Sequence, residues 1–369
     1  MKNERMVLCR PYCGLNDMLV QIEKCYRYCK KYRRKLYVDG NIGGFLDDFK
    51  NYFIPCDNNI SFDKIEFLTP PFDVFPECLY NDLYNYVIQP QEEKGLLCIT
   101  LNGIPLRFNF KKNYEEQILV HVQCGGGDIG IFALARLSLK EDIKSHIRKT
   151  VEDLKCQSGK KSRYDAIHVR NTSVKTDYKS YFTEIREKIN KTTVICTDDY
   201  EVQQYAKVYF GEKIIAVTEI PDLSSCEIKL LESNKYIDRY KTNVDTITDL
   251  FILACADRVF YAPIAVDYSL NVNPFKDENP IMYYVKPGKK SGYQILAKNL
   301  HDNKKIIKNM LYKETDNLLS HRFALLECHI RYTFTNTIRI FHKIFTLLFK
   351  EGILFTAKFI YSKLFKSHN

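Results

Sequence analysis

The chain of 369 residues has no long apolar run. No stretch contains the roughly 18 apolar residues that a membrane-spanning helix needs, and the opening residues MKNERMVLCRPYCG hold no secretory signal. We therefore expect a cytoplasmic protein. Low-complexity tracts and internal repeats do not stand out either, and 45% hydrophobic with 27% charged residues is typical of a globular chain.

Paired cysteine motifs are also missing, although the chain has 13 cysteines. There is no CxxC pair and no histidine-rich segment beside them, which argues against a metal site. In a reducing cytosol, scattered cysteines such as Cys9, Cys25 and Cys29 are typical of small core residues. We expect them to be free, and we expect no bound metal.

Two further motif classes do not occur. The triple glycine from Gly125 to Gly127 matches neither the GxGxxG fingerprint nor a Walker loop, and no GxSxG elbow exists. A hydrolase therefore has no support. We interpret the triple glycine as a loop whose backbone can approach a substrate closely.

Positive charge is concentrated at the C-terminal end. The net charge is +10, and residues 301 to 369 hold 12 basic against 5 acidic side chains. Apolar residues at helical spacing between Ile338 and Phe365 lie among lysines and arginines. Such a basic amphipathic helix favours an anionic membrane surface as the partner, rather than nucleic acid. The alternative is a terminal helix packed across both domains.

The length predicts two domains and an extension. We place an α/β domain at residues 1–156, a second α/β domain at 164–300 and a basic amphipathic helical tail at 301–369. The first domain opens with a strand at 6–10, a helix and a second strand from Lys35, a pattern that builds parallel sheets. The sequence of residues 45–117 predicts irregular structure. A strand is predicted from Ile118 and leads into the triple glycine.

The second domain shows a regular alternation. Apolar strands at 165–170, 192–197, 213–217 and 258–263 alternate with helical segments, which predicts a doubly wound parallel sheet. Ligands of such sheets bind beyond the carboxyl ends of the strands. His168 and Arg170 lie at one of these ends, and we expect them near a ligand.

Three groups of polar residues follow strand ends or a helix in this domain. They are His168 and Arg170 with the loop to Asp177, the pair Asp198 and Asp199, and Asp249 with the strand end at 261–263. An arginine can grip a diphosphate, and a carboxylate can accept the N1 and N2 hydrogens of guanine, so the pattern favours a nucleoside diphosphate. The alternatives are helix caps for the aspartate pair, a core role for His168 and a solvated position for Asp249.

Four segments of the chain carry motifs of one known family. They are PYCGLNDMLVQ from Pro11, HVRNTSVKTD from His168, CTDDYEVQQYAK from Cys196 and DLFILACADRVF from Asp249. Their text, order and spacing resemble the inverting fucosyltransferases of the GT-B type. This group includes α-1,6-fucosyltransferases, the nodulation fucosyltransferases of rhizobia and protein O-fucosyltransferases.

The resemblance implies an α/β fold of the GT-B type, in which two Rossmann-like domains face a cleft, with residues 1–156 on the acceptor side and residues 164–300 binding the nucleotide sugar. It implies GDP-fucose as the donor, with no metal cofactor. Arg170 matches the arginine that binds the diphosphate and stabilises the charge on departing GDP. The donor-binding positions implied besides Arg170 are His168, Asp198, Asp199, Asp249, Asn16 and Gly14.

Inversion needs a base that takes the proton of the acceptor hydroxyl. The family's lysine and glutamate best match Lys175 and Asp177, and Asp17 in the first loop is the competing candidate. The chain departs from the family at Asn171 and Ser173, where the family has an arginine and an aspartate.

We expect fucose to be transferred to a glycan or lipid-linked oligosaccharide of a cell-surface polysaccharide or glycolipid, on the inner face of a membrane. Two alternatives stay open. One is a GT-B glycosyltransferase with another nucleotide-sugar donor. The other is a non-catalytic glycan-binding or scaffold protein of the same fold.

Overall fold

The computed structural model describes residues 4–42, 45–86, 89–93, 96–101, 103–123, 125–158, 163–171, 176–222, 238–264, 290–312 and 318–351. The chain divides into two compact units, Met1–His321 and Arg322–Asn369, and each is described by itself. The first unit holds two parallel sheets with their helices, and the second holds most of one long helix.

The first sheet has the strand order β4-β2-β1-β9-β5, and every pairing in it is parallel. Its strands are β1 (Met6–Pro11), β2 (Lys35–Val38), β4 (Ile60–Ser61), β5 (Val74–Phe75) and β9 (Ile118–Gln123). Helix α1 (Leu15–Tyr32) connects β1 to β2 and buries Met18, Ile22 and Cys25. The predicted strand, helix and strand opening is confirmed.

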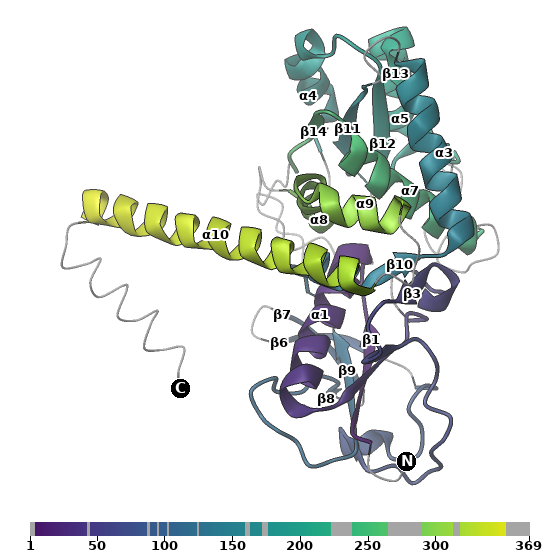
Figure 1. Ribbon diagram of the computed structural model, residues 1–369, viewed down its shortest axis with the longest axis vertical. Coiled ribbons are helices and arrows are strands. Elements are labelled where there is room, and N and C mark those ends of the chain that lie inside the picture. The colour runs from purple at the N-terminus through teal and green to yellow at the C-terminus, as the bar shows by residue number, and fades with distance from the viewer. Residues whose placement is uncertain are drawn as a thin grey trace. The chain divides into compact units, whose positions relative to one another are not determined.

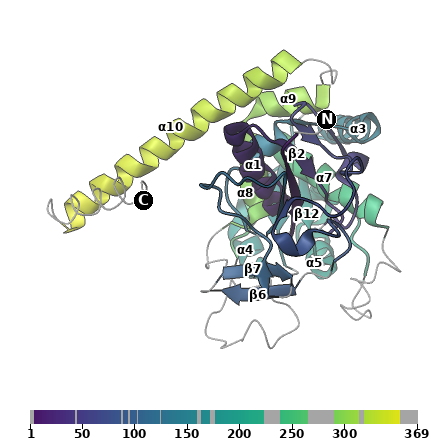
Figure 2. The same cartoon turned by 90° about the horizontal axis from the view of Figure 1, so that it is seen from below.

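Short elements fill the region between β2 and β9, as the sequence indicates. They are the 3₁₀ turns η1 (Phe49–Asn51) and η2 (Glu77–Leu79), and the strands β3 (Phe53–Pro55), β6 (Gln89–Glu93), β7 (Leu96–Leu101) and β8 (Ile104–Pro105). The antiparallel pair β6 and β7 forms a hairpin (Figure 2). Strand β3 pairs with β10 (Leu137–Leu139).

The second sheet has the order β13-β12-β11-β14 and is again entirely parallel. Its strands are β11 (Asp165–Val169), β12 (Thr193–Thr197), β13 (Ile214–Ile215) and β14 (Val259–Tyr261). Its helical elements are α4 (Tyr178–Ile185), η4 (Arg186–Lys188), α5 (Tyr200–Phe210), η5 (Gly211–Lys213) and α7 (Arg239–Cys255), of which α5 and α7 lie beside β12 in Figure 1. The predicted α/β class, with a doubly wound second sheet, is confirmed.

Each sheet has its own apolar core. Met6, Leu8 and Val120 are buried in the first core, and Ile167 and Ile195 in the second. Helices α2 (Gly130–Leu134), α3 (Glu141–Gln157), α8 (Gly292–Asp302) and α9 (Lys304–Tyr312) complete the first unit. Two parallel α/β sheets in one chain are the architecture that the GT-B resemblance implies.

Helix α10 (Leu318–Glu351) begins about 20 residues before the predicted amphipathic segment, because its helical pattern continues upstream. The rest of that segment, from residue 352, lies outside the described residues. A search of the described helices for one long and apolar enough to span a bilayer found none.

The cysteines divide into two groups. Cys9, Cys25 and Cys29 are free and buried, as expected of core residues. Cys13, however, is disulfide-bonded, so the expectation of free cysteines is wrong at this position.

Candidate active site

The carboxyl end of β11 carries His168, which is buried with 5% of its surface exposed. Its ring stacks on Tyr293 with 5.2 Å between the centroids. Burial lowers the pKa of His168 to about 4, although the charge of Asp198 opposes the shift, so the ring is neutral at pH 7. Its Nδ1 atom has no hydrogen-bond partner in the described part of the chain. A core role is thus compatible with a ring nitrogen available to a ligand.

Arg170 follows β11 and pairs with Asp198, with 3.1 Å between Nη1 and Oδ2. Their side chains are 35% and 26% exposed. An ion pair with this much solvent contact contributes only about 0–1 kcal/mol. A diphosphate can therefore compete for the guanidinium without a large loss.

Asn171, the next residue, contacts both aspartates that follow β12. Its backbone N–H donates to Asp198 Oδ1 over 2.8 Å, and its Nδ2 donates to Asp199 Oδ2 over 2.8 Å. Its Oδ1 accepts from the backbone N–H of Thr176 at 3.0 Å. Asp199 also caps helix α5, accepting from Val202 N. The helix-cap alternative is confirmed for Asp199, and Asn171 has a clear structural use.

Asp249 on α7 lies behind the same strands. It is only 9% exposed, so the alternative of a solvated helix residue is wrong. Thr218 Oγ1 donates to its two oxygens at 3.0 and 3.1 Å. Burial raises the pKa of Asp249 to about 8, against hydrogen bonds from Thr218 and Cys196.

Asn16 and Asp17 at the start of α1 face three glycines from distant parts of the chain. Asn16 Nδ2 donates to the Gly127 carbonyl at 3.1 Å. A Cβ added to Gly126 would lie 2.8 Å from Asp17 Oδ1, and one added to Gly292 would lie 3.3 Å from the same atom. A side chain at either glycine would push the Asp17 carboxylate out of place, which agrees with the predicted close approach of the glycine loop.

Asp17 lies in α1 of the first sheet and Arg170 follows β11 of the second, and the charge of Arg170 acts on the Asp17 carboxyl. Burial raises the pKa of the Asp17 carboxyl, while a hydrogen bond from Asn16 and the charges of Arg170 and Lys24 act in the opposite direction. The structure thus brings Asn16, Asp17, His168, Arg170 and Asp198 toward one region. A carboxylate with raised proton affinity beside an arginine has the features of a general base near an anion site.

The remaining predicted residues are Asp177, Gly14 and Lys175. Asp177 is exposed and caps α4, accepting from Ser180 N at 3.2 Å, and these bonds lower the pKa of its carboxyl. Gly14 is exposed at the N-cap of α1. Lys175 and Ser173 lie outside the described residues.

Sequence reasoning missed Tyr293 and Gly292 at the start of α8. Ser291 and Gln294 form a capping box there, and Gln294 Nε2 donates to the Ala262 carbonyl at 3.0 Å. This bond ties α8 to the end of β14. The Ser-x-x-Gln spacing is visible in the sequence and could have located the helix start, though not its contact with His168.

Among the described residues, no group of three or more His, Cys, Asp or Glu side chains could hold a metal ion.

Comparisons with known proteins give the following result. No family model and no curated protein matches the chain. Among solved structures, it is similar to NodZ α-1,6-fucosyltransferase co-crystallised with GDP, at 16% identity and a TM-score of 0.49 over 80% of this chain and 92% of that one. A fucosyltransferase NodZ from Bradyrhizobium is 17% identical, with a TM-score of 0.46 over 69% and 88%. A FUT1 variant of Arabidopsis thaliana bound to GDP is 10% identical, with a TM-score of 0.40 over 69% and 65%.

Proposed function

We propose that the protein is an inverting glycosyltransferase that transfers fucose from GDP-fucose without a metal. The observation that carries the proposal is the position of Arg170 at the end of β11, where it pairs with Asp198 and its charge acts on the half-buried Asp17 of α1. NodZ structures were obtained with GDP or GDP-fucose. For this chain, the donor assignment rests on the sequence motifs and on the position of Arg170.

Donor binding is assigned to the end of the second sheet. Arg170 exchanges Asp198 for the diphosphate and stabilises the negative charge that develops as GDP leaves. The neutral His168, backed by Tyr293, offers a ring nitrogen to the donor. Asp199 and Asp249 are assigned to supporting this site, because helix α5, Asn171 and Thr218 already occupy their oxygens.

Asp17 is our choice as the base. The acceptor oxygen attacks the anomeric carbon, the bond from that carbon to the GDP oxygen breaks, and the acceptor's proton moves to Asp17. Its raised pKa and its place beside Arg170 support this role. Asp177 is the weaker candidate, because its exposed carboxylate caps α4 and its pKa is lowered.

The donor proposal is tested by calorimetric titration with GDP and by thermal shift with GDP-fucose, other GDP-sugars and UDP-sugars. Arg170→Ala is expected to lose GDP binding, whereas the exposed Arg163→Ala serves as the matched control and keeps it. Stabilisation by UDP-sugars alone would favour another donor. If GDP binds but no acceptor of any kind releases it, the protein is a non-catalytic binding protein.

The base is tested with two variants. Asp17→Asn is expected to reduce kcat by about 10²–10⁴ while GDP binding persists, because only the proton acceptor is lost. Asp177→Asn is expected to retain the kcat of the unmodified protein. The reverse result would move the base to Asp177.

We further propose that α10 holds the enzyme at the inner face of a membrane, near a lipid-linked acceptor. Exposed apolar residues recur along one side of α10 at steps of three or four, namely Phe323, Leu326, Ile330, Phe334, Ile338 and Phe341. Basic residues such as Arg339 lie on the same helix. This pattern is typical of helices that lie in the interface of an anionic membrane.

The test is sedimentation with vesicles that contain anionic lipid. Phe334→Glu with Phe341→Glu is expected to leave the protein in the supernatant. The exposed polar exchange Thr335→Ser on the same helix is the control. Equal sedimentation of both variants would contradict the role of α10.

A further inference from the structure

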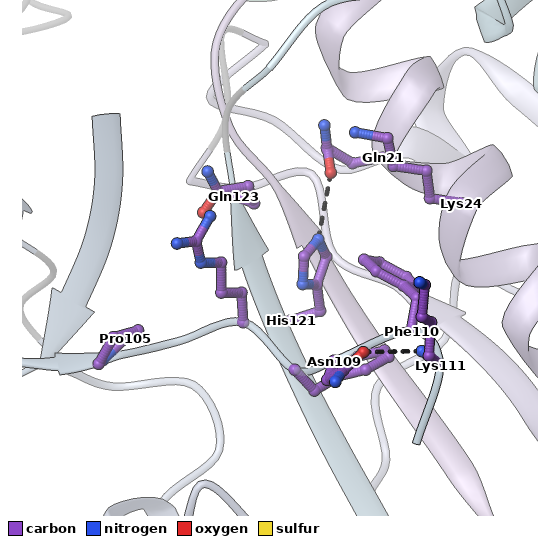
Figure 3. Close-up of a pocket in the computed structure, with 10 residues that line it drawn as sticks. Gln21, Lys24, Pro105, Asn109, Phe110, Lys111, His121 and Gln123 are labelled. Atoms are coloured by element: carbon purple, nitrogen blue, oxygen red, sulfur yellow. Dashed lines mark hydrogen bonds between the residues drawn. The ribbon is translucent and has the colours of Figure 1, made fainter. Parts of the chain in front are cut away.

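A second feature of the first sheet is a pocket of about 630 Å³ beside α1 and β9. Its lining comes from α1, from β9 and from the segment that follows β8, as Figure 3 shows. None of the residues assigned to the donor lines it. The pocket is therefore a separate candidate binding site.

The charges around this pocket have one sign. Among its ten described lining residues, Lys24, Arg107 and Lys111 are basic and none is acidic. His121 also lines the pocket, and burial together with the charges of Lys24 and Arg107 lowers its pKa, which keeps the ring neutral. The same burial lowers the pKa of Lys24. Cations partly withdrawn from water favour an anionic ligand.

Aromatic rings form part of the pocket wall and are held in fixed orientations. Phe108 and Phe110 meet edge to face with His121 at 5.3 and 5.1 Å. Tyr28 packs against Phe108 from behind, with 4.7 Å between ring centroids. A rigid aromatic wall with a few charged groups is a common design for sites that bind small molecules, including the apolar face of a sugar ring.

The pocket continues the same side of α1 that carries Asp17. Asp17, Gln21 and Lys24 are spaced at i, i+4 and i+7, which places them in one row along about 10 Å of helix. The charge of Lys24 acts on Asp17 directly. A ligand of two or three sugar units can therefore reach from the proposed base into the pocket.

A hydrogen-bond chain links the pocket to the glycine loop. Gln21 Nε2 donates to the Gly125 carbonyl at 2.7 Å, so its Oε1 faces His121 Nε2, at 3.1 Å. Figure 3 shows the second contact as a dashed line. Since that oxygen only accepts, His121 carries its proton on Nε2 and contributes no positive charge. The positively charged side chains that can bind an anion in this pocket are therefore Lys24, Arg107 and Lys111.

We propose that this pocket binds an acidic sugar unit of the acceptor, whose carboxylate or phosphate contacts Lys24 and Arg107 and whose ring packs against Phe110. The neighbouring sugar unit then presents its hydroxyl to Asp17. The inference rests on the proposed function for its acceptor, although the binding preference itself can be measured without turnover.

The experiment uses the full chain in the presence of GDP. The probes are a tetrasaccharide containing glucuronic acid, the same tetrasaccharide with its carboxyl groups reduced to alcohols, and the reduced form carrying a single phosphate. Affinities are measured by calorimetry at low and at high salt. The acidic probes are expected to bind about tenfold more tightly than the neutral one, with the advantage shrinking as salt rises. The relative affinity of the carboxylate and phosphate probes identifies which anion the pocket prefers.

The variants separate the pocket from the surface charge. Lys24→Gln with Arg107→Gln is expected to abolish the preference for acidic probes. The exposed Lys31→Gln, at the end of α1 and outside the pocket, should retain it. Because Lys24 also acts on Asp17, the ratio between acidic and neutral probes is the readout, rather than either affinity alone. Melting curves verify that each variant is folded.

Equal binding of acidic and neutral probes, no binding of any probe, or a preference that survives in the double variant would each overturn the inference. GDP titration in the same samples separates the two proposals. If the unmodified protein binds GDP but shows no preference for acidic probes, the pocket proposal is refuted and the donor assignment stands. A pocket-dependent preference without GDP binding refutes the donor assignment alone.

Discussion

The buried Asp249 gives a prediction whose size follows from its pKa. Its carboxyl has a pKa of about 8 in the folded chain against an ordinary value of 3.8, so between these values the folded state holds a proton that the unfolded state has released. Folding stability therefore decreases as pH rises through this range. The loss is about 1.4 kcal/mol per pH unit well below pH 8 and fades above it, which amounts to roughly 2–3 kcal/mol between pH 6 and 9.

Asp249→Asn removes the ionisation and keeps the shape. Thr218 can still donate to the amide oxygen. The variant should lack this pH dependence, so its stability relative to the parent should increase between pH 6 and pH 9 by the amount given above. Urea unfolding at both pH values measures the difference, with the exposed Asp153→Asn as the control. Parallel pH dependences of parent and variant would show that Asp249 is ionised throughout and would refute the reasoning.

Two further predictions concern the glycine loop and the second sheet. Gly126→Ala should leave the chain folded, because the atom in its way is the end of the flexible Asp17 side chain, but it should reduce turnover by about 10². Turnover of Gly126→Ala equal to that of the parent would contradict a role for Asp17. Asp165→Asn removes the negative charge of a buried carboxylate that pairs with Lys191 and Arg258. Urea unfolding should show that the free energy of unfolding falls by about 1–3 kcal/mol. An unchanged unfolding midpoint would mean that these pairs contribute nothing.

The second sheet could be predicted because its signals are local. Helix α5 (Tyr200–Phe210) is one of the helical segments expected between the apolar strands, and β12 (Thr193–Thr197) lies within the strand predicted at 192–197. Two-residue strands such as β4 and β5 could not be predicted, because two residues carry no periodicity. Their positions depend on pairing with β2 and β9.

The site was harder to predict than the fold, because its contacts join distant segments. Arg170 could be recognised from its place at a strand end, but its electrostatic contact with Asp17 depends on how the two sheets assemble. Phe108 and Phe110 lie in a segment that the sequence indicates only as irregular, and their wall exists because β9 places His121 against them. The regular row of Gln21 and Lys24 after Asp17 was the one local signal of the pocket.

In the proposed reaction, Arg170 would also let donor binding prepare the base. In the protein alone its charge lowers the pKa of Asp17 and partly offsets the effect of burial. A diphosphate that takes over the guanidinium neutralises this charge, so the pKa of Asp17 rises and the carboxylate becomes a stronger base once the donor is in place. In the proposed reaction, the departure of GDP would let Arg170 pair with Asp198 again and favour the ionised form of Asp17, which would help the base to release its proton. Asn171 fits this cycle, because it holds Asp198 and Asp199 through neutral hydrogen bonds and leaves the charge of Arg170 to act on the donor.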